Sequence, residues 1–306
     1  MANNISSFRQ LKLIVHNEFM TDIRGKGFWI ATFVVPVLMG AFSLFIGFLA
    51  KDSTALQAIS SPASSDVEDF GAEQVAAMLV GMFLTLFIMM YGAQIFNKVK
   101  TEKTNRIVEI LSTCVEGRTM MLAKIISVAL IGILQILIWG LLLFLIIGGL
   151  VLVFLPDESF TFLSSSTFWI GAAVSLLYFI GGYLVYGSLY AAAGALTDKN
   201  NENQEYMTIL TFVLLGSFYV GQFAVDNASS ALTLWCEYIP LTSPTIGSIN
   251  AVSGAASWWV TLISLIILYA SAYFCISLSG KIYRSSLLLM GKKFSPKDIL
   301  TFLKSK

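Results

Sequence analysis

The sequence predicts an all-α polytopic membrane protein in which residues 1–306 form a single transmembrane domain. Hydrophobic residues make up 57% of the chain and charged residues only 12%, whereas soluble domains carry about 25% charged residues. Six segments are predominantly apolar and reach the roughly 20 residues that a helix needs to cross a hydrocarbon core. Lys and Arg are confined almost entirely to alternate connections between these segments. These three observations together favour six transmembrane helices.

Residues 6–24 predict an amphipathic helix that lies on the membrane surface, which we term the interface helix. Its apolar side repeats at helical spacing with Phe8, Leu11, Val15 and Phe19. Arg9 and Lys12 follow on another face, and Arg24 stands at the end. A charged face opposite an apolar face is typical of helices that rest in the membrane interface.

The six transmembrane helices are expected at residues 28–50, 75–96, 121–155, 168–196, 207–225 and 258–278. The third segment exceeds the length needed to cross, so it must tilt, bend or project beyond the bilayer. In the fourth, Gly187, Ala191 and Ala195 recur at steps of four, and small residues at that spacing allow close helix packing. Residues 281–306 form a basic tail.

Counting positive charges fixes the expected orientation. With six spans both termini share a side, and 18 of the 19 Lys and Arg residues lie on that side, Lys51 being the exception. Acidic residues divide evenly, as expected when they contribute little to topology. Both termini are therefore predicted to be cytoplasmic. The outer interface is expected at Trp169, Trp235, Trp258 and Trp259, and the inner interface at Trp29.

Residues 98–118, between the second and third spans, read as a cytoplasmic helix. The stretch lacks proline and is rich in helix-forming residues. Glu102, Arg106 and Glu109 follow steps of four and three, which places them on one helical face. Such a face can be merely exposed to solvent, or its basic residues can reflect the positive-inside rule of membrane topology. The mixture of acids with bases favours the alternative that it is a docking surface.

Residues 238–259, YIPLTSPTIGSINAVSGAASWW, separate the fifth and sixth spans. The stretch is too apolar for a free loop and too short to cross the membrane. Pro240 and Pro244 are expected to break any helix here. We therefore expect a partly re-entrant outer segment that is buried against protein.

Several kinds of chemistry are not supported by the sequence. There is no GxxxxGK[ST] motif for ATP phosphates and only one histidine, so no HExxH site is possible. The three cysteines have no metal-ligand spacing. We expect no catalytic site, metal or cofactor in the chain, and no nucleic acid as partner. Gln94 and Gln135 are polar residues within spans, and either hydrogen bonds between helices or a substrate path could explain them.

Three stretches resemble ABC-2 type transporter permeases, especially the branch with NatB-like sodium-efflux permeases: EKTNRIVEILSTCVEGRTMMLAKI after the second span, YIPLTSPTIG before the last, and GKIYRSSLLLMGKKFSPKDIL at the end. The resemblance implies a permease of the bacterial cytoplasmic (inner) membrane that dimerises, as a homo- or heterodimer. It would bind two copies of a separate ABC ATPase subunit, which holds the ATP and Mg²⁺. The chain itself would not be an enzyme.

The resemblance also implies roles for particular residues. A cytoplasmic coupling helix touching the ATPase would contain Glu102, Lys103, Arg106, Glu109 and Leu111. The interface helix, with Arg9, Lys12 and Arg24, would form a second contact. Pro240 and Pro244 would lie in the outer re-entrant element.

The family leaves the cargo open among sodium, drugs, peptides, lipids and polysaccharides. The short connection at residues 51–72 argues against sodium, since many NatB-like members carry a large domain there. Two other classes remain as alternatives: an ion-coupled secondary transporter, and a non-transporting membrane assembly or sensor protein.

Overall fold

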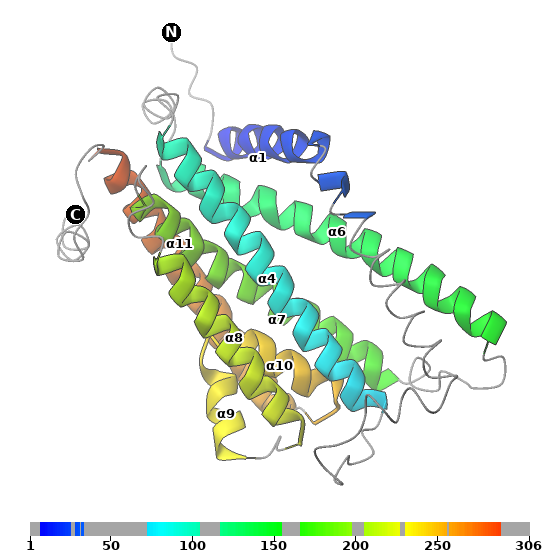
Figure 1. Ribbon diagram of the computed structural model, residues 1–306. Helices are drawn as coiled ribbons and strands as arrows, with labels where there is room; N and C mark the ends of the chain where they lie inside the picture. The colour runs from blue at the N-terminus through cyan, green and yellow to red at the C-terminus, as the bar shows by residue number, and fades with distance from the viewer. Residues whose placement is uncertain are drawn as a thin grey trace.

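The computed structural model describes residues 7–25, 28–30, 32–33, 72–104, 117–154, 166–197, 205–226, 230–255 and 257–288. Throughout these residues the regular structure is helical (Figure 1). The helices are α1 (Ser7–Arg24), α4 (Ala72–Thr104), α6 (Gly117–Phe154), α7 (Ser166–Leu196), α8 (Glu205–Asp226), α9 (Ala231–Tyr238), α10 (Ser243–Val252) and α11 (Trp258–Leu288). The all-α prediction is therefore confirmed for the described part of the chain.

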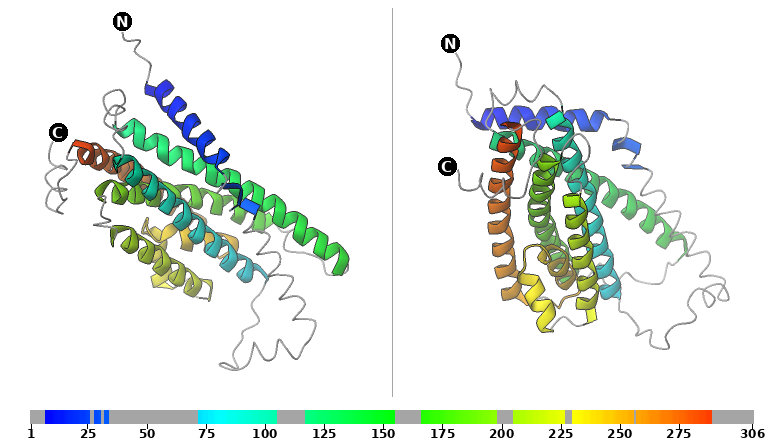
Figure 2. Two further views of the ribbon diagram at one scale, coloured as in Figure 1. Left: turned by 45° about the horizontal axis from the view of Figure 1, so that its top comes forward. Right: turned by 60° about the vertical axis from the view of Figure 1, so that its left-hand side comes forward.

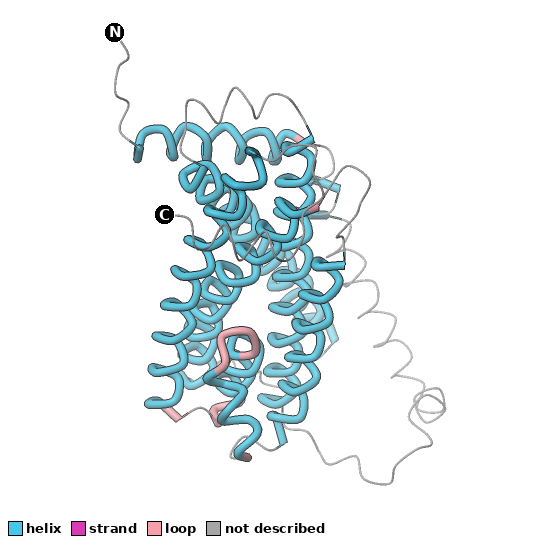
Figure 3. Tube along the Cα trace, turned by 90° about the vertical axis from the view of Figure 1, so that its left-hand side faces the viewer, coloured by secondary structure: helices cyan, strands magenta, loops and turns pink. Residues whose placement is uncertain are grey.

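The long helices run side by side, with α7 packed against both α4 and α11. Helix α6 begins beside the other helices and diverges from them toward its C-terminal end (Figure 1). Helix α1 lies across one end of the bundle, where α4 and α11 end and α6 begins (Figure 2). The short helices α9 and α10 and the loops that join them lie at the opposite end (Figure 3). We call these two ends the α1 end and the α10 end.

Five of the expected six membrane spans are confirmed as helices of sufficient length and apolarity. Their apolar stretches are Val80–Glu102, Thr119–Trp139, Trp169–Leu196, Glu205–Ala224 and Trp258–Ser286. The remaining span, expected at 28–50, falls largely outside the described residues, although 28–30 and 32–33 are helical. The structure thus shows a multi-pass helical protein, and the sixth span stays a prediction.

Two helices continue further than the hydropathy pattern predicts. Helix α4 ends at Thr104 instead of 96, and α11 ends at Leu288 instead of 278. Residues 98–104, assigned from sequence to a separate cytoplasmic helix, are therefore the last two turns of α4. Hydropathy marks only the part of a helix that can sit in hydrocarbon, whereas the helix itself continues while its residues favour it.

The segment between the fifth and sixth spans is more helical than predicted. Pro244 was expected to break a helix, but it lies in the first turn of α10, where its missing N–H group is not needed for an intrahelical bond. Pro240 lies in the turn between α9 and α10. Every residue of α10 is buried, because the helix packs against α4, α7 and α8. Within this segment α10 is therefore buried against protein, whereas Trp258 and Trp259 are exposed; its re-entry into the membrane stays a prediction.

Close packing of α4 on α7 depends on small residues. Gly187, Ala191 and Ala195 are all buried in α7, and a Cβ added to Gly187 would lie 3.1 Å from Ile95 Cδ1. A closer approach, between backbones, involves a residue outside that stripe. A Cβ on Gly194 would lie 2.6 Å from the backbone oxygen of Phe96, so the two helix backbones are nearly in contact here.

Candidate functional site

A cluster of paired charges ties α1 to three long helices at the α1 end, and we call this cluster the junction. It consists of Glu18 and Asp22 from α1, Lys98 and Glu102 from α4, Lys124 and Ser127 from α6, and Tyr283 from α11. These residues are far apart in the sequence. They meet because α1 lies across the end of the bundle at which α4 and α11 end and α6 begins (Figure 2).

Lys124 is the centre of the junction. Its side chain is only 3% exposed. The ammonium group donates to Glu18 Oε1 at 2.8 Å and also to Glu102 Oε1. Ser127, on the next turn of α6, donates to the other oxygen of Glu18 at 3.1 Å. A buried ammonium is stable only when it is paired, and here two carboxylates from two different helices supply that pairing.

Lys98 and Tyr283 complete the cluster on either side. Lys98 pairs with Asp22, and its Nζ lies 3.7 Å from Glu18 Oε2. The Tyr283 hydroxyl donates to Glu102 Oε2 at 3.4 Å. Two ammonium groups thus face three carboxylates across three helices, and α11 adds a hydroxyl group. Moving α1 relative to the bundle would separate several of these pairs at once and leave buried charges uncompensated.

The opposite face of α1 is free of the bundle and basic. Arg9, Lys12 and Arg24 are all exposed, as is His16 between them. Val15, by contrast, is buried against the bundle. Helix α1 therefore has one face that holds the junction and another that presents positive charge outward. An anionic protein surface or anionic lipid headgroups are the chemistry that such a face attracts.

The predicted coupling residues separate into two groups. Glu102 is 33% exposed, and both of its carboxylate oxygens are turned toward Lys124 and Tyr283 and not outward. Lys103 occupies the last turn of α4. Arg106, Glu109 and Leu111 lie outside the described residues, so their assignment to an ATPase contact stays a prediction.

The two glutamines singled out within spans differ in their surroundings. Gln135 is buried, and its Oε1 accepts a hydrogen bond from the Tyr91 hydroxyl. This contact joins α4 to α6, which is the structural role that a buried amide commonly has between membrane helices. Gln94 is half-buried on α4. A role for either glutamine in lining a substrate path stays a prediction.

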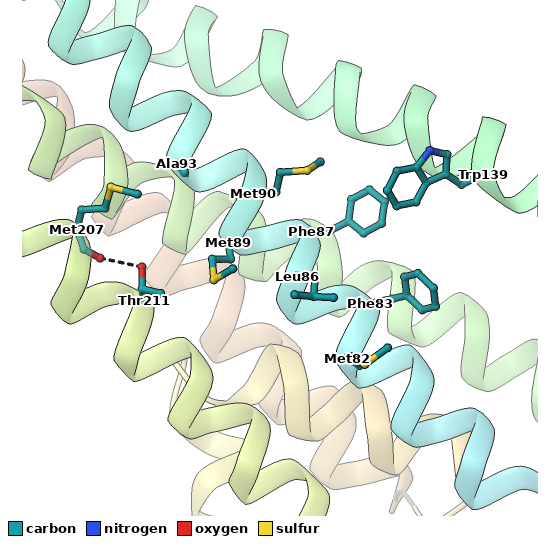
Figure 4. Close-up of a pocket in the computed structure, with 10 residues that line it drawn as sticks. All are labelled: Met82, Phe83, Leu86, Phe87, Met89, Met90, Ala93, Trp139, Met207 and Thr211. Atoms are coloured by element: carbon teal, nitrogen blue, oxygen red, sulfur yellow. Dashed lines mark hydrogen bonds between the residues drawn. The ribbon is translucent and has the colours of Figure 1, made fainter. Parts of the chain in front are cut away.

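An apolar groove of about 560 Å³ opens between α4, α6 and α8 (Figure 4). Its lining is Met82, Phe83, Leu86, Phe87, Met89, Met90, Ala93, Trp139, Met207 and Thr211. The one hydroxyl, that of Thr211, already donates to the Met207 carbonyl at 2.9 Å. Flexible methionine side chains adapt to differently shaped apolar groups. The groove can accept hydrocarbon, and none of the described residues that line it carries a charge to hold an ion.

Sequence reasoning did not identify Lys124, Glu18, Asp22 or Lys98 as partners. A signal was nevertheless present for Lys124, which stands seven residues into the 38-residue helix α6. Ionisable residues at the edge of an apolar span are costly to bury and usually have a partner. The sequence does not reveal which residue is that partner, because the pairs form between helices distant in the chain.

Comparisons with known proteins agree with this architecture. A family model described as "ABC-2 family transporter protein" matches residues 50–281. The uncharacterized protein YhaP of Bacillus subtilis (strain 168) is 24% identical over 245 residues, which are 79% of this chain and 58% of that relative. The chain therefore spans little more than half the length of the relative, and no solved structure matches it significantly. Because the family model covers most of the chain, including all five confirmed spans except the end of the last, the protein belongs to the ABC-2 transporter family.

Proposed function

We propose that this chain is the membrane-spanning permease subunit of an ATP-driven exporter, and that separate ABC ATPase subunits drive it from the α1 end. Membership of the ABC-2 transporter family supports a permease role. In this proposal the α1 end faces the cytoplasm, the chain lies in a bacterial inner membrane, and two permease copies work with two ATPase copies. ATP and Mg²⁺ are held by the partner.

The observation that carries the proposal is the pairing of Lys124 with both Glu18 and Glu102. An ATPase that moves α1 acts on a helix already fixed to α4 and α6 by ion pairs, of which those of Lys124 involve a buried ammonium group. Breaking those pairs is costly, so a displacement of α1 is transmitted to the long helices as a rigid-body movement. Packed helices that move as units are the usual basis of such transitions.

The outward face of α1 supplies a place for the ATPase to bind. Arg9, Lys12 and Arg24 are exposed there. The family resemblance implies that the same residues form a second contact with the ATPase. Residues 105–116, which contain Arg106 and Glu109, would supply the first contact. Thus Glu102 would hold the junction together just before residues 105–116. Residues 105–116 themselves would touch the ATPase.

The apolar groove supports a cargo with a hydrocarbon part. Its lining comes from α4, α6 and α8 and presents thioethers and aromatic rings. Burial of such surface contributes about 25 cal/mol per Å² to binding. A lipid, a drug or an acylated peptide fits this chemistry better than a bare ion does.

Reconstitution tests the proposal directly. The permease is placed in liposomes with a candidate ATPase subunit, and ATP hydrolysis and efflux of apolar cargoes are measured together. We expect hydrolysis to rise when the permease is present and efflux to require ATP. Efflux driven by an ion gradient without nucleotide would identify a secondary transporter instead. Partner binding with no efflux under either condition would favour an assembly or sensor protein.

A further inference from the structure

Glu237 is a buried carboxyl group at the end of the molecule opposite the junction. It lies in α9, the short helix that closes the α10 end, and is only 2% exposed. Asn250 of α10 donates from Nδ2 to Glu237 Oε2 at 2.9 Å. Tyr178 of α7 donates to Oε1 at 3.4 Å. The carboxyl group is thus enclosed by three helices and bound by neutral donors.

The surroundings of Glu237 contain no compensating positive charge within the described part of the chain. Its neighbour on α11, Ser264, donates to the Glu237 backbone oxygen at 2.6 Å, and Thr261 lies on the same helix close to Tyr178. The only titratable side chain among these neighbours is therefore Tyr178. Burial raises the pKa of Glu237 above its ordinary value, against an opposing effect of the hydrogen bonds from Asn250 and Tyr178.

Asn250 provides a second and independent observation. It is 2% exposed, and its Oδ1 atom is buried without a hydrogen-bond partner among the residues described. A buried acceptor without a hydrogen-bond partner lowers the free energy of unfolding by about 1–3 kcal/mol. The same amide group already donates to Glu237, so its free oxygen lies beside the carboxyl group. A proton on that carboxyl would convert an acceptor into a donor, and the acid and amide could then exchange one hydrogen bond in each direction.

We propose that Glu237 is a proton-binding site, occupied while α9 is packed against α10 and emptied to water when this end of the bundle opens. In the occupied form the neutral acid pairs with Asn250, which leaves no charge buried between α7, α9, α10 and α11. In the emptied form the carboxylate needs water that the closed packing excludes. Proton release and opening of the α10 end are therefore linked, whatever drives transport.

Infrared spectroscopy of the full chain in lipid nanodiscs tests this directly, because a protonated carboxyl has a carbonyl stretch distinct from that of a carboxylate. Wild type is compared with Glu237→Gln, and with Glu205→Gln as a matched control, since Glu205 is an exposed acid at the start of α8. We expect a protonated-carboxyl band that persists to higher pH than that of an exposed carboxyl group, is lost in the Glu237 variant and is retained in the control. Identical spectra of wild type and Glu237→Gln from mildly acidic to alkaline pH would overturn the proposal.

Tyr178→Phe provides a second measurement that leaves the acid in place. The tyrosine hydroxyl donates to the carboxyl group, and this bond favours the charged form. Its removal should shift the midpoint at which the band disappears to higher pH. A midpoint unchanged from wild type would contradict the assignment of the band to Glu237, even if Glu237→Gln could not be purified.

Discussion

Lys124 of α6 holds Glu18 of α1 at 2.8 Å, although the two residues are 106 positions apart in the sequence. This contact decides how α1 is attached to the protein. An interface helix held only by apolar contacts could slide or rotate on the membrane surface. The ion pair, centred on the buried Lys124 ammonium and shared with Glu102 of α4, gives α1 one defined position. The first two predictions follow from this arrangement.

Replacing Lys124 with methionine keeps much of the side-chain volume and removes the charge. The variant leaves Glu102 without its cation and Glu18 with only the more distant Lys98, so we expect a loss of about 1–3 kcal/mol in the free energy of unfolding. Urea-induced unfolding of the protein in nanodiscs measures this free energy. Lys98→Met is the matched control. Because Lys98 is 23% exposed, its removal should cost clearly less; equal losses would contradict the central place given to Lys124.

The triple variant Lys124→Met, Glu18→Gln, Glu102→Gln separates folding from coupling. With no unpaired charge left, most of the lost stability should return, because buried ion pairs are often replaceable by neutral side chains. The rigid connection between α1 and the long helices would still be missing. We expect a folded permease that binds its ATPase but no longer stimulates ATP hydrolysis. Stimulation equal to wild type would show that the junction does not transmit force.

Charge reversal on the outer face of α1 tests where the ATPase binds. Arg9→Glu with Lys12→Glu should leave unfolding within about 0.5 kcal/mol of wild type, since both side chains are exposed. Co-purification of the ATPase should fall, and co-purification with wild type should itself weaken as salt is raised, because salt screens the attraction. Lys281→Glu, also exposed and on α11, is the control and should retain the partner. Full co-purification of the double variant would exclude this face.

Gly194→Ala tests the close contact of α7 with α4. The new methyl group would meet the backbone oxygen of Phe96 at 2.6 Å, so the helices must separate, at a cost of about 1–3 kcal/mol. Gly216→Ala in α8 is the control, because nothing lies within 4 Å of a Cβ there. It should stabilise the helix slightly, by up to about 1 kcal/mol. Thermal unfolding of both variants should therefore shift in opposite directions.

The pH dependence of stability should contain a component from Glu237. Its pKa in the folded protein is raised above the ordinary 4.5, so the folded state binds more protons than the unfolded state above that pH. Stability must then fall as pH rises from about 4.5 through the raised pKa. Unfolding temperatures of wild type and Glu237→Gln, compared across pH, should diverge over this window, with wild type the less stable at the alkaline end. Parallel curves would contradict a raised pKa.

Much of the helical architecture could be predicted because hydropathy is a local property. The spans expected at 168–196 and 207–225 agree with α7 and α8 to within two residues at each end. Helix ends were less predictable where charge followed an apolar run, as in α4 after residue 96. A charged residue there does not reveal whether it faces solvent or a partner on another helix. Glu102 was assigned to an outward face for this reason, and the structure turns it toward Lys124.

The sequence by itself determined that this is a helical, multi-pass membrane protein, and it predicts that the positive charge lies on one side of the membrane. These properties follow from composition and from the cost of exposing polar groups to hydrocarbon. Each spanning segment must satisfy its own backbone polar groups, whatever its neighbours are. Only the tertiary structure decided that Glu18 and Glu102 meet at the buried Lys124, and that Glu237 meets Asn250 beneath α9. Such pairs depend on which helices become neighbours, and a buried charge acquires its role only from the group placed beside it.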